Sequence, residues 1–146
     1  MSTPATTTSR RTDRSSLLLR VVGALALGYS AYLHFRIASD GPPLVQDGEV
    51  SFAGLFVAQA VAATLVSLWV LLQGSRLAWL AFAVVAVASL AALLLSTWLT
   101  IPSIGPLPSL HDPAWYTDKV LAAVAAGVAT LAALAALATI GRRARS

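Results

Sequence analysis

The sequence predicts an all-α fold, a bundle of four transmembrane helices that run up-down-up-down with both chain ends in the cytoplasm. The composition gives the first reason: 58% of the 146 residues are hydrophobic and only 11% are charged, too little charge to cover a water-soluble domain. The apolar residues form separate runs of roughly 20 residues, long enough to cross a ~30 Å hydrocarbon core. Basic residues gather at alternate ends of these runs, a distribution that sets orientation.

The chain opens with residues 1–16, which are rich in serine, threonine and arginine and which we expect to form a disordered cytoplasmic tail. The four-helix transmembrane domain is expected over 17–141, and its first span covers about 17–38. Small residues recur in this span at a spacing of four, a pattern that lets another helix approach closely. Gly41-Pro42-Pro43 then ends the helix, and Asp47-Gly48 predicts a tight turn in the connector.

The second span is expected over about 51–72 and the third over about 77–100. Gly74 lies between them at a position that suits the end of a helix. A connector this short permits only an antiparallel hairpin. Pro102 marks the end of the third span, because proline cannot continue a helix.

The last helix is predicted to begin at Asp112-Pro113, with the aspartate as N-cap and the proline in the first turn. An interfacial turn around Trp115 follows. The helix then crosses the membrane over about 120–140, an uncharged run of sufficient length. Residues 142–146 form a basic cytoplasmic tail.

Most basic side chains belong to one side of this map, which comprises the tails, the start of the first span and the turn before the third. They are Arg10, Arg11, Arg14, Arg20, Arg76, Arg142, Arg143 and Arg145. The opposite side has only Arg36 and Lys119, so we expect the arginine-rich side to be cytoplasmic and the protein to be multi-pass in the plasma membrane. Tryptophans are expected in pairs at the inner and the outer interface: Trp69 and Trp79, then Trp98 and Trp115.

Several classes of function are disfavoured. The absence of cysteine excludes disulfides, thiolate metal sites and cysteine nucleophiles. No Asp, Glu, Lys or Arg lies between the interfaces, whereas an ion-coupled transporter normally needs an ionisable group near mid-membrane. The basic residues lie in tails and a turn rather than on a folded face, which argues against nucleic acid as a partner.

A polar cluster is confined to the outer third of the predicted spans. Tyr29, Tyr32 and Arg36 share one face of the first helix, and His34 lies on the adjacent face. If the helix faces converge, they enclose a ligand-binding pocket that opens outward. The candidate residues are Tyr29, Tyr32, His34, Arg36, Gln59, Thr97, Asp118 and Lys119. The structural alternative is that the tyrosines and the arginine anchor the interface and that Gln59 bonds a neighbouring helix.

Asp118 and Lys119 also have a structural interpretation. The carboxylate favours the positive end of a helix, and the ammonium can reach lipid phosphates or pair with an acid of the first external connector. The proline-stiffened loop over 102–113 is a candidate docking surface for a partner protein. Its candidate contact residues are Pro106, Pro108, His111 and Trp115.

His34 and His111 both fall on the outer side, which raises the hypothesis of a metal or haem site. No short fixed spacing links the two residues, so interfacial hydrogen bonding is the preferred interpretation, and neither a metal nor a cofactor is expected. A hydrolase built on His111 with Asp112 or Ser109 is disfavoured, because adjacent loop residues rarely form the required hydrogen-bond chain and no nucleophile elbow is present.

Several short motifs point to a family. They are Tyr29-Ser30-Ala31-Tyr32-Leu33-His34, Gln59, Gly105-Pro106-Leu107-Pro108, Asp112-Pro113-Ala114-Trp115-Tyr116 and Lys119. Through them the chain resembles a group of small four-helix integral membrane proteins of actinobacteria, over roughly residues 20–130. The arginine-led, glycine-containing first helix is similar to that of DoxX-type four-helix membrane proteins. The resemblance implies a bacterial plasma-membrane protein and transfers no activity and no residue role.

These observations predict a non-enzymatic integral membrane protein, an accessory or interaction subunit whose loop over 102–113 docks a partner. The partner would be another membrane protein or a second copy of the chain, within membrane lipid. One alternative is an outer-leaflet binding module for a lipid, a quinone or another neutral amphipathic molecule. The other alternative is a metal- or haem-dependent membrane enzyme.

Overall fold

The structure, a computed structural model, describes residues 7–46, 49–100, 102–105, 107–109 and 111–145. It contains four helices and one short hairpin, in the order α1 (Thr7–Ser39), β1 (Val45–Gln46), β2 (Glu49–Val50), α2 (Phe52–Leu72), α3 (Arg76–Trp98) and α4 (Thr117–Arg143). All four helices are long and apolar enough to cross a membrane. The prediction of an all-helical fold with four membrane-spanning candidates is therefore confirmed.

The helix bounds differ most from the prediction at the two chain ends. α1 begins at Thr7, whereas residues 1–16 were expected to form a disordered tail. Once the apolar run has nucleated a helix, each further residue adds a hydrogen bond at little cost, so the helix extends into the Ser/Thr/Arg segment. At the other end, α4 continues through Arg143 into the predicted tail.

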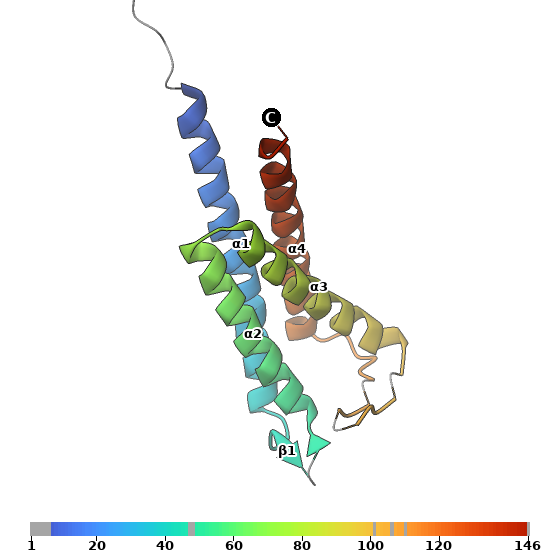
Figure 1. The fold of residues 1–146 in the computed structure, drawn as a ribbon. Coiled ribbons are helices and arrows are strands. Elements are labelled where there is room, and N and C mark those ends of the chain that lie inside the picture. The colour runs from blue at the N-terminus through green and yellow to red at the C-terminus, as the bar shows by residue number, and fades with distance from the viewer. Residues whose placement is uncertain (1–6, 47–48, 101, 106, 110, 146) are drawn as a thin grey trace, which may run out of the picture.

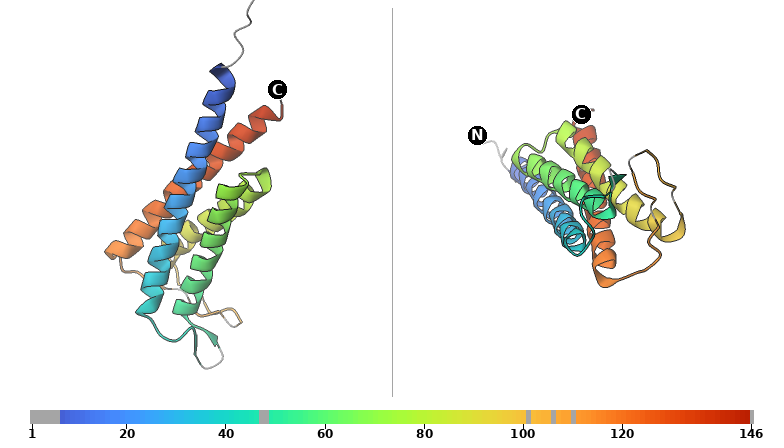
Figure 2. Two further views of the ribbon diagram at one scale, coloured as in Figure 1. Left: turned by 90° about the vertical axis from the view of Figure 1, so that its left-hand side faces the viewer. Right: turned by 90° about the horizontal axis from the view of Figure 1, so that it is seen from below.

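The helices of the bundle share two ends, which we name from the chain segments found there. Figure 1 shows the start of α1, the C-terminus and the α2–α3 turn toward one end, here called the terminal end. The α1–α2 connector and the α3–α4 connector lie at the other, the connector end. Figure 2 shows that α1 and α4 project beyond the α2–α3 turn.

Serine and glycine define the bounds of α2 and α3. The Ser51 and Ser75 side chains each accept a hydrogen bond from a backbone N–H in the first turn of α2 and α3, at 3.2 Å. Gly74 follows α2 with φ +57°, the left-handed conformation that favours glycine after a helix. The Arg20 guanidinium lies against Gly74, so a side chain at this position would also collide with α1.

The predicted start of α4 is wrong. The helix begins at Thr117 with Tyr116 as its N-cap residue, and no side chain caps it. Asp112 lies outside the helix because its backbone carbonyl and its carboxylate both contact Lys119. These contacts hold the intervening segment in an extended path, so Asp112-Pro113 cannot form the first turn.

The α1–α2 connector contains a small antiparallel hairpin that the sequence reading did not include. Val45 pairs with Val50, and Gln46 pairs with Glu49. This register leaves two residues between the strands, as a tight hairpin requires. The predicted turn residues, Asp47 and Gly48, lie outside the described part of the chain.

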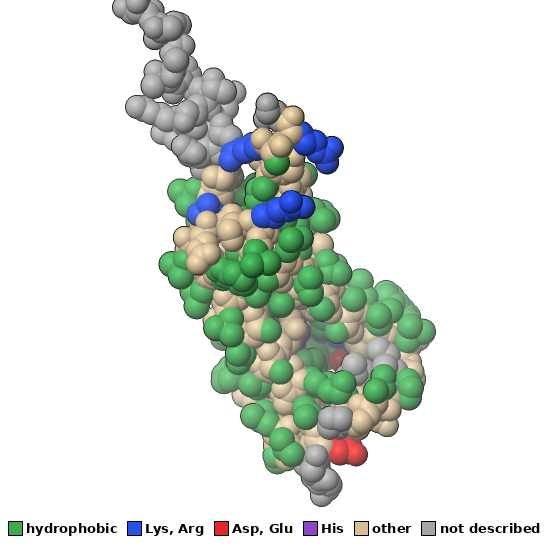
Figure 3. All heavy atoms as spheres, in the orientation of Figure 1, with side chains coloured by type: hydrophobic (Ala, Val, Ile, Leu, Met, Phe, Trp, Pro, Cys, Tyr) green, Lys and Arg blue, Asp and Glu red, His purple; other side chains and the backbone are tan. Residues whose placement is uncertain are grey.

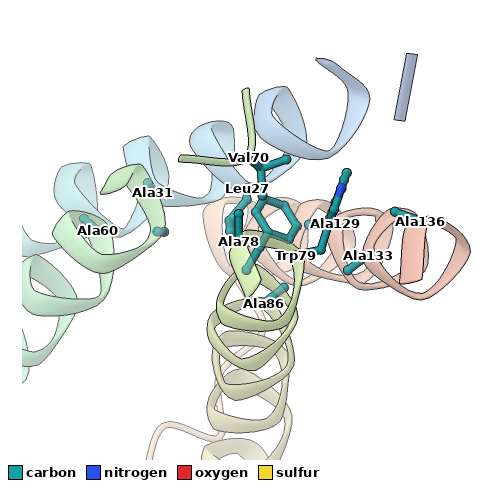
Figure 4. Close-up of a cluster of buried hydrophobic side chains, with 12 residues drawn as sticks. Leu27, Ala31, Ala60, Val70, Ala78, Trp79, Ala86, Ala129, Ala133 and Ala136 are labelled. Carbon is teal, nitrogen blue, oxygen red and sulfur yellow. The ribbon is translucent and has the colours of Figure 1, made fainter. Parts of the chain in front are cut away.

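The main core lies toward the terminal end and joins all four helices (Figure 4). Phe82 and Trp79 pack edge to face, with ring centroids 5.3 Å apart, against Leu27 and Val70. Trp79 was expected at the inner membrane interface; its side chain lies in the first turn of α3 but is only 2% exposed, so it faces the interior of the bundle and not its outer surface. Small residues opposite the ring leave room for it inside the bundle.

The contact between α1 and α4 consists of small residues. Alanines recur at spacings of three and four along one face of α4, and those with no exposed surface are Ala122, Ala126, Ala129 and Ala133. The Ser30 hydroxyl donates across the contact to the Ala122 carbonyl at 3.4 Å. Such a face lets two helix backbones approach closely, which is how helices associate where no water drives them together.

α2 and α3 are close at their turn and then diverge. In Figure 1, α3 runs obliquely away from α2 toward the connector end, whereas α2 follows α1. The space between them is bordered by side chains of α2 and α3, by His34 of α1, by Lys119 of α4 and by Asp112 of the α3–α4 connector. This divergence positions the candidate site.

Packing between α1 and α4 makes a first prediction. Ala129→Leu adds three carbons where the wild-type side chain is fully buried, and we expect a destabilisation of about 1–3 kcal/mol. Ala135→Leu makes the same change on the exposed face of α4 and serves as the matched control. Thermal unfolding in detergent, followed by tryptophan fluorescence, should show a lower midpoint for Ala129→Leu alone. Equal midpoints for the two variants would contradict close α1–α4 packing.

Candidate functional site

A cavity of about 280 Å³ lies between α2 and α3 in the half of the bundle nearer the connector end. Its wall is mostly apolar, and polar side chains from five segments of the chain gather within it: α1, α2, α3, the α3–α4 connector and α4. The lining residues are His34, Phe52, Leu55, Phe56, Gln59, Ala88, Ser89, Ala92, Leu93, Ser96, Asp112 and Lys119. Figure 3 shows the molecule hollowed between α2 and α3, with purple and red side-chain atoms visible inside the hollow.

His34 comes from α1 and is 3% exposed. Its Nδ1 lies 2.7 Å from the Ser30 carbonyl oxygen, one turn earlier in the helix. A carbonyl oxygen can only accept, so Nδ1 carries a hydrogen and donates it. The imidazole ring also meets the Phe56 ring edge to face, with centroids 5.6 Å apart. These two contacts fix the ring at the wall of the cavity.

Gln59 of α2 and Ser89 of α3 meet across the cavity. The Gln59 amide nitrogen donates to the Val85 carbonyl at 3.5 Å, a link from α2 to α3. The Ser89 hydroxyl is buried and has no hydrogen-bond partner among the described residues. Because Val85 is one turn before Ser89, Gln59 uses the carbonyl that a helical serine would ordinarily contact.

Lys119 is the most deeply buried charged side chain in the described part of the chain, at 1% exposed. Its Nζ donates to the Asp112 backbone carbonyl and lies 3.2 Å from the Asp112 carboxylate. The same atom lies 5.3 Å from the centre of the Trp115 ring, within range of a cation–π interaction. Lys119 was expected to reach lipid phosphates or an acid of the α1–α2 connector. The structure instead pairs it with the connector that precedes its own helix.

Asp112 joins the end of α3 to the start of α4. Its backbone N–H donates to the Ser96 carbonyl at 2.8 Å, and its carboxylate accepts from the Tyr116 hydroxyl at 3.4 Å. Burial of the phenol, followed by the negative charge of Asp112 and the hydrogen bond to it, raises the pKa of Tyr116 to about 12. Tyr116 therefore remains a neutral donor to Asp112 throughout the physiological range.

The structure brings three of the eight predicted pocket residues together: His34, Gln59 and Lys119. Tyr29 and Tyr32 share a face, as predicted, with ring centroids 6.3 Å apart. That face points outward, and both side chains are exposed.

The other three predicted pocket residues have local structural contacts. Arg36 forms an ion pair with Asp118 at 3.6 Å that links α1 to α4 outside the cavity. Thr97 donates to the Leu93 carbonyl within α3. Tyr29, Tyr32 and Arg36 lie outside the cavity, in keeping with the structural alternative. Gln59 satisfies both interpretations, because it lines the cavity and also bonds a neighbouring helix, as that alternative predicted.

The predicted docking loop is only partly described. Pro108 is half-buried, His111 is exposed, and Pro106 lies outside the described residues. Trp115 contacts both the Lys119 ammonium and the Trp98 ring, whose centroid is 6.3 Å away. Trp115 therefore also has a role within the fold, as one wall around Lys119.

The eight predicted pocket residues did not include the apolar wall or three of the polar lining residues, Ser89, Ser96 and Asp112. A signal for Ser89 was present, since Ser89 and Ser96 are seven residues apart and so share a helix face. Asp112 carried no comparable signal, because its role depends on the backbone path between it and Lys119. The two histidines do not converge: His34 is buried and His111 is exposed. Within the described ranges, no group of three or more His, Asp or Glu side chains is arranged to hold a metal ion.

Neither a protein-family model, nor a curated protein, nor a solved structure matches this chain.

The ion pair beside the cavity makes a second prediction. Asp112→Asn leaves a buried ammonium without its carboxylate, and we expect a destabilisation of about 2–3 kcal/mol, tempered by the partial exposure of Asp112. Lys119→Met should destabilise the protein less than Asp112→Asn does, because the Asp112 carboxylate that remains can turn toward water. Combining both changes should recover much of the stability lost in Asp112→Asn. Unfolding midpoints in detergent test this order, and a Lys119→Met variant less stable than Asp112→Asn would refute it.

Proposed function

We propose that this multi-pass membrane protein binds a small amphipathic molecule in the cavity between α2 and α3. One observation carries the proposal: an apolar hollow contains a cluster of buried polar groups, including Lys119 and Ser89. Ligand sites typically combine an apolar lining with a few polar groups that orient the ligand. An amphipathic molecule matches both parts.

The route into the cavity favours a ligand that comes from the bilayer. The hollow lies between two helices that are each long and apolar enough to span a membrane. Ala88 and Ala92, on the α3 side, are exposed, so small side chains border the entrance. A molecule dissolved in the lipid can therefore enter sideways, with its head group toward Lys119 and its chain toward the acyl region.

We further propose that the terminal end is cytoplasmic and that the cavity opens to the outer leaflet of a bacterial plasma membrane. Arginine supports this orientation: Arg20, Arg76, Arg142, Arg143 and Arg145 lie toward the terminal end, which the positive-inside rule assigns to the cytoplasm. Docking of a partner protein by residues 102–113 stays a prediction. Ligand binding has the stronger support because buried polar groups face the hollow.

Occlusion tests the binding proposal. Ala92→Phe places a ring in the cavity, whereas Val84→Phe places the same ring on an exposed face of α3 and is the matched control. Purified protein is titrated with monoolein and followed by native mass spectrometry. We expect saturable binding that Ala92→Phe weakens at least tenfold, with Val84→Phe unchanged. Absence of saturable binding, or equal binding by the two variants, would reject the cavity as the site.

Labelling tests the orientation. Because the chain has no cysteine, Ser109→Cys and Ala144→Cys each introduce a single thiol. An impermeant maleimide should label Ser109→Cys on intact cells and Ala144→Cys only after lysis. The reverse pattern would place the cavity in the inner leaflet.

A further inference from the structure

We infer that the head group of the ligand is a hydroxyl, so that the natural ligand class is a neutral single-chain lipid alcohol. This inference rests on the proposed function and specifies its ligand. It follows from the hydrogen-bonding atoms that the cavity leaves unused, which include acceptors as well as donors. A hydroxyl is the small head group that can serve both.

The first acceptor is His34. Since Nδ1 donates to the Ser30 carbonyl, Nε2 of the neutral ring carries a lone pair and no hydrogen. The Nδ1 contact turns that edge of the ring toward the α1 backbone, which leaves Nε2 directed away from α1. Among the described residues, no hydrogen bond to Nε2 is present, although the side chain is almost fully buried and lines the cavity. A hydrogen-bond donor on the ligand would satisfy the Nε2 acceptor of His34.

The second acceptor is Gln59. Its amide nitrogen must be the atom that faces the Val85 carbonyl, because two oxygens cannot form a hydrogen bond. The amide oxygen consequently faces away from that carbonyl, on a side chain that lines the cavity. The Gln59 amide oxygen is therefore a second acceptor that needs a hydrogen-bond donor from the ligand.

Ser89 provides the complementary donor. The hydroxyls of Thr64, Thr97 and Thr130 each donate to a carbonyl one turn earlier in the same helix, at 2.8–2.9 Å. The Ser89 hydroxyl makes no such bond, is 2% exposed and lines the cavity. The Ser89 hydroxyl is therefore an unpaired polar group in the cavity wall. Its oxygen has almost no accessible surface, so it becomes a donor to a ligand oxygen when the side chain turns toward the cavity.

The charges near the cavity are balanced. The Lys119 ammonium is paired with Asp112 through both the carboxylate and the backbone carbonyl. The pair has no net charge and does not favour an anionic head group, while the third N–H of the ammonium can still donate to a neutral oxygen. An ester, a ketone or a carboxylate only accepts, and it would displace water from His34 Nε2 and Gln59 Oε1 at the cavity wall without supplying a donor to either atom.

The size of the cavity fits a head group and the first part of a chain. A protein cavity of about 150 Å³ holds a benzene-sized molecule, and this one has about 280 Å³. The remainder of a lipid chain must therefore extend beyond the cavity, through the opening between α2 and α3. A volume of this size has room for the first part of one chain beside the head group, and we therefore assign a single-chain ligand.

Four probes with the same chain but different head groups test the inference: oleyl alcohol, monoolein, methyl oleate and oleate. Each is titrated against the purified full-length protein by native mass spectrometry. We expect oleyl alcohol and monoolein to bind about tenfold more tightly than methyl oleate and oleate, the difference expected when buried acceptors lack a donor. Ser89→Ala should weaken binding of the alcohols several-fold and leave methyl oleate unchanged. Ser67→Ala, which removes the other buried unpaired hydroxyl, should change neither, because Ser67 lies outside the cavity.

The outcomes separate the two proposals. If all four probes bind equally and Ala92→Phe weakens them all, the cavity binds amphiphiles but the hydroxyl preference is wrong. Tighter binding of oleate than of oleyl alcohol overturns the inference in favour of an anionic ligand. If none of the probes binds in an Ala92-dependent way, both proposals fail. Gln59→Leu provides a second variant, in which the preference for alcohols should shrink while methyl oleate binds as before.

Discussion

A buried ammonium is the constraint on which the connector end of this protein depends. An unpaired charge in apolar surroundings costs several kcal/mol, so Lys119 requires a partner, and it has one in Asp112. That requirement fixes the segment between the two residues in an extended path. Because the Asp112 N–H also donates to the Ser96 carbonyl, the same segment ties the end of α3 to the start of α4. One ion pair thereby positions an irregular connector and one wall of the cavity.

The cavity itself follows from unequal helix packing. Alanine stripes let α1 and α4 approach closely, and Trp79 with Phe82 holds α3 against them near the terminal end. Toward the connector end, the cavity separates Phe52 and Phe56 of α2 from small residues of α3 such as Ala88 and Ala92. The cavity therefore lies where α2 and α3 diverge, away from the aromatic core that joins α3 to α1 and α4.

The presence of four long helices could be predicted from the sequence, because apolar runs of this length bounded by proline, glycine and serine are compatible with few structures other than membrane-spanning helices. The start of α4 could not, since Asp112-Pro113 has the local chemistry of a helix start and only the contact with Lys119 overrides it. Trp79 shows the same limit: tryptophan near a span end is typical of an interface, yet neighbouring alanines make room for it in the core. For the site, helical spacing identified His34 and Gln59 but could not show that Tyr29 and Tyr32 face outward, because that depends on how the helices are rotated.

The placement of the polar groups is what connects this structure to a function. In a hydrocarbon environment no bulk water is available, so each polar atom left without a partner carries a cost that the fold must offset elsewhere. Most hydroxyls in these helices avoid that cost by donating to their own backbone, a solution equally open to Ser89. Gln59 instead donates to the Val85 carbonyl, and Ser89, whose hydroxyl is buried and unpaired, lines the cavity with His34 and Lys119. Structural needs alone do not account for this arrangement, whereas a ligand that both donates and accepts accounts for each of these groups.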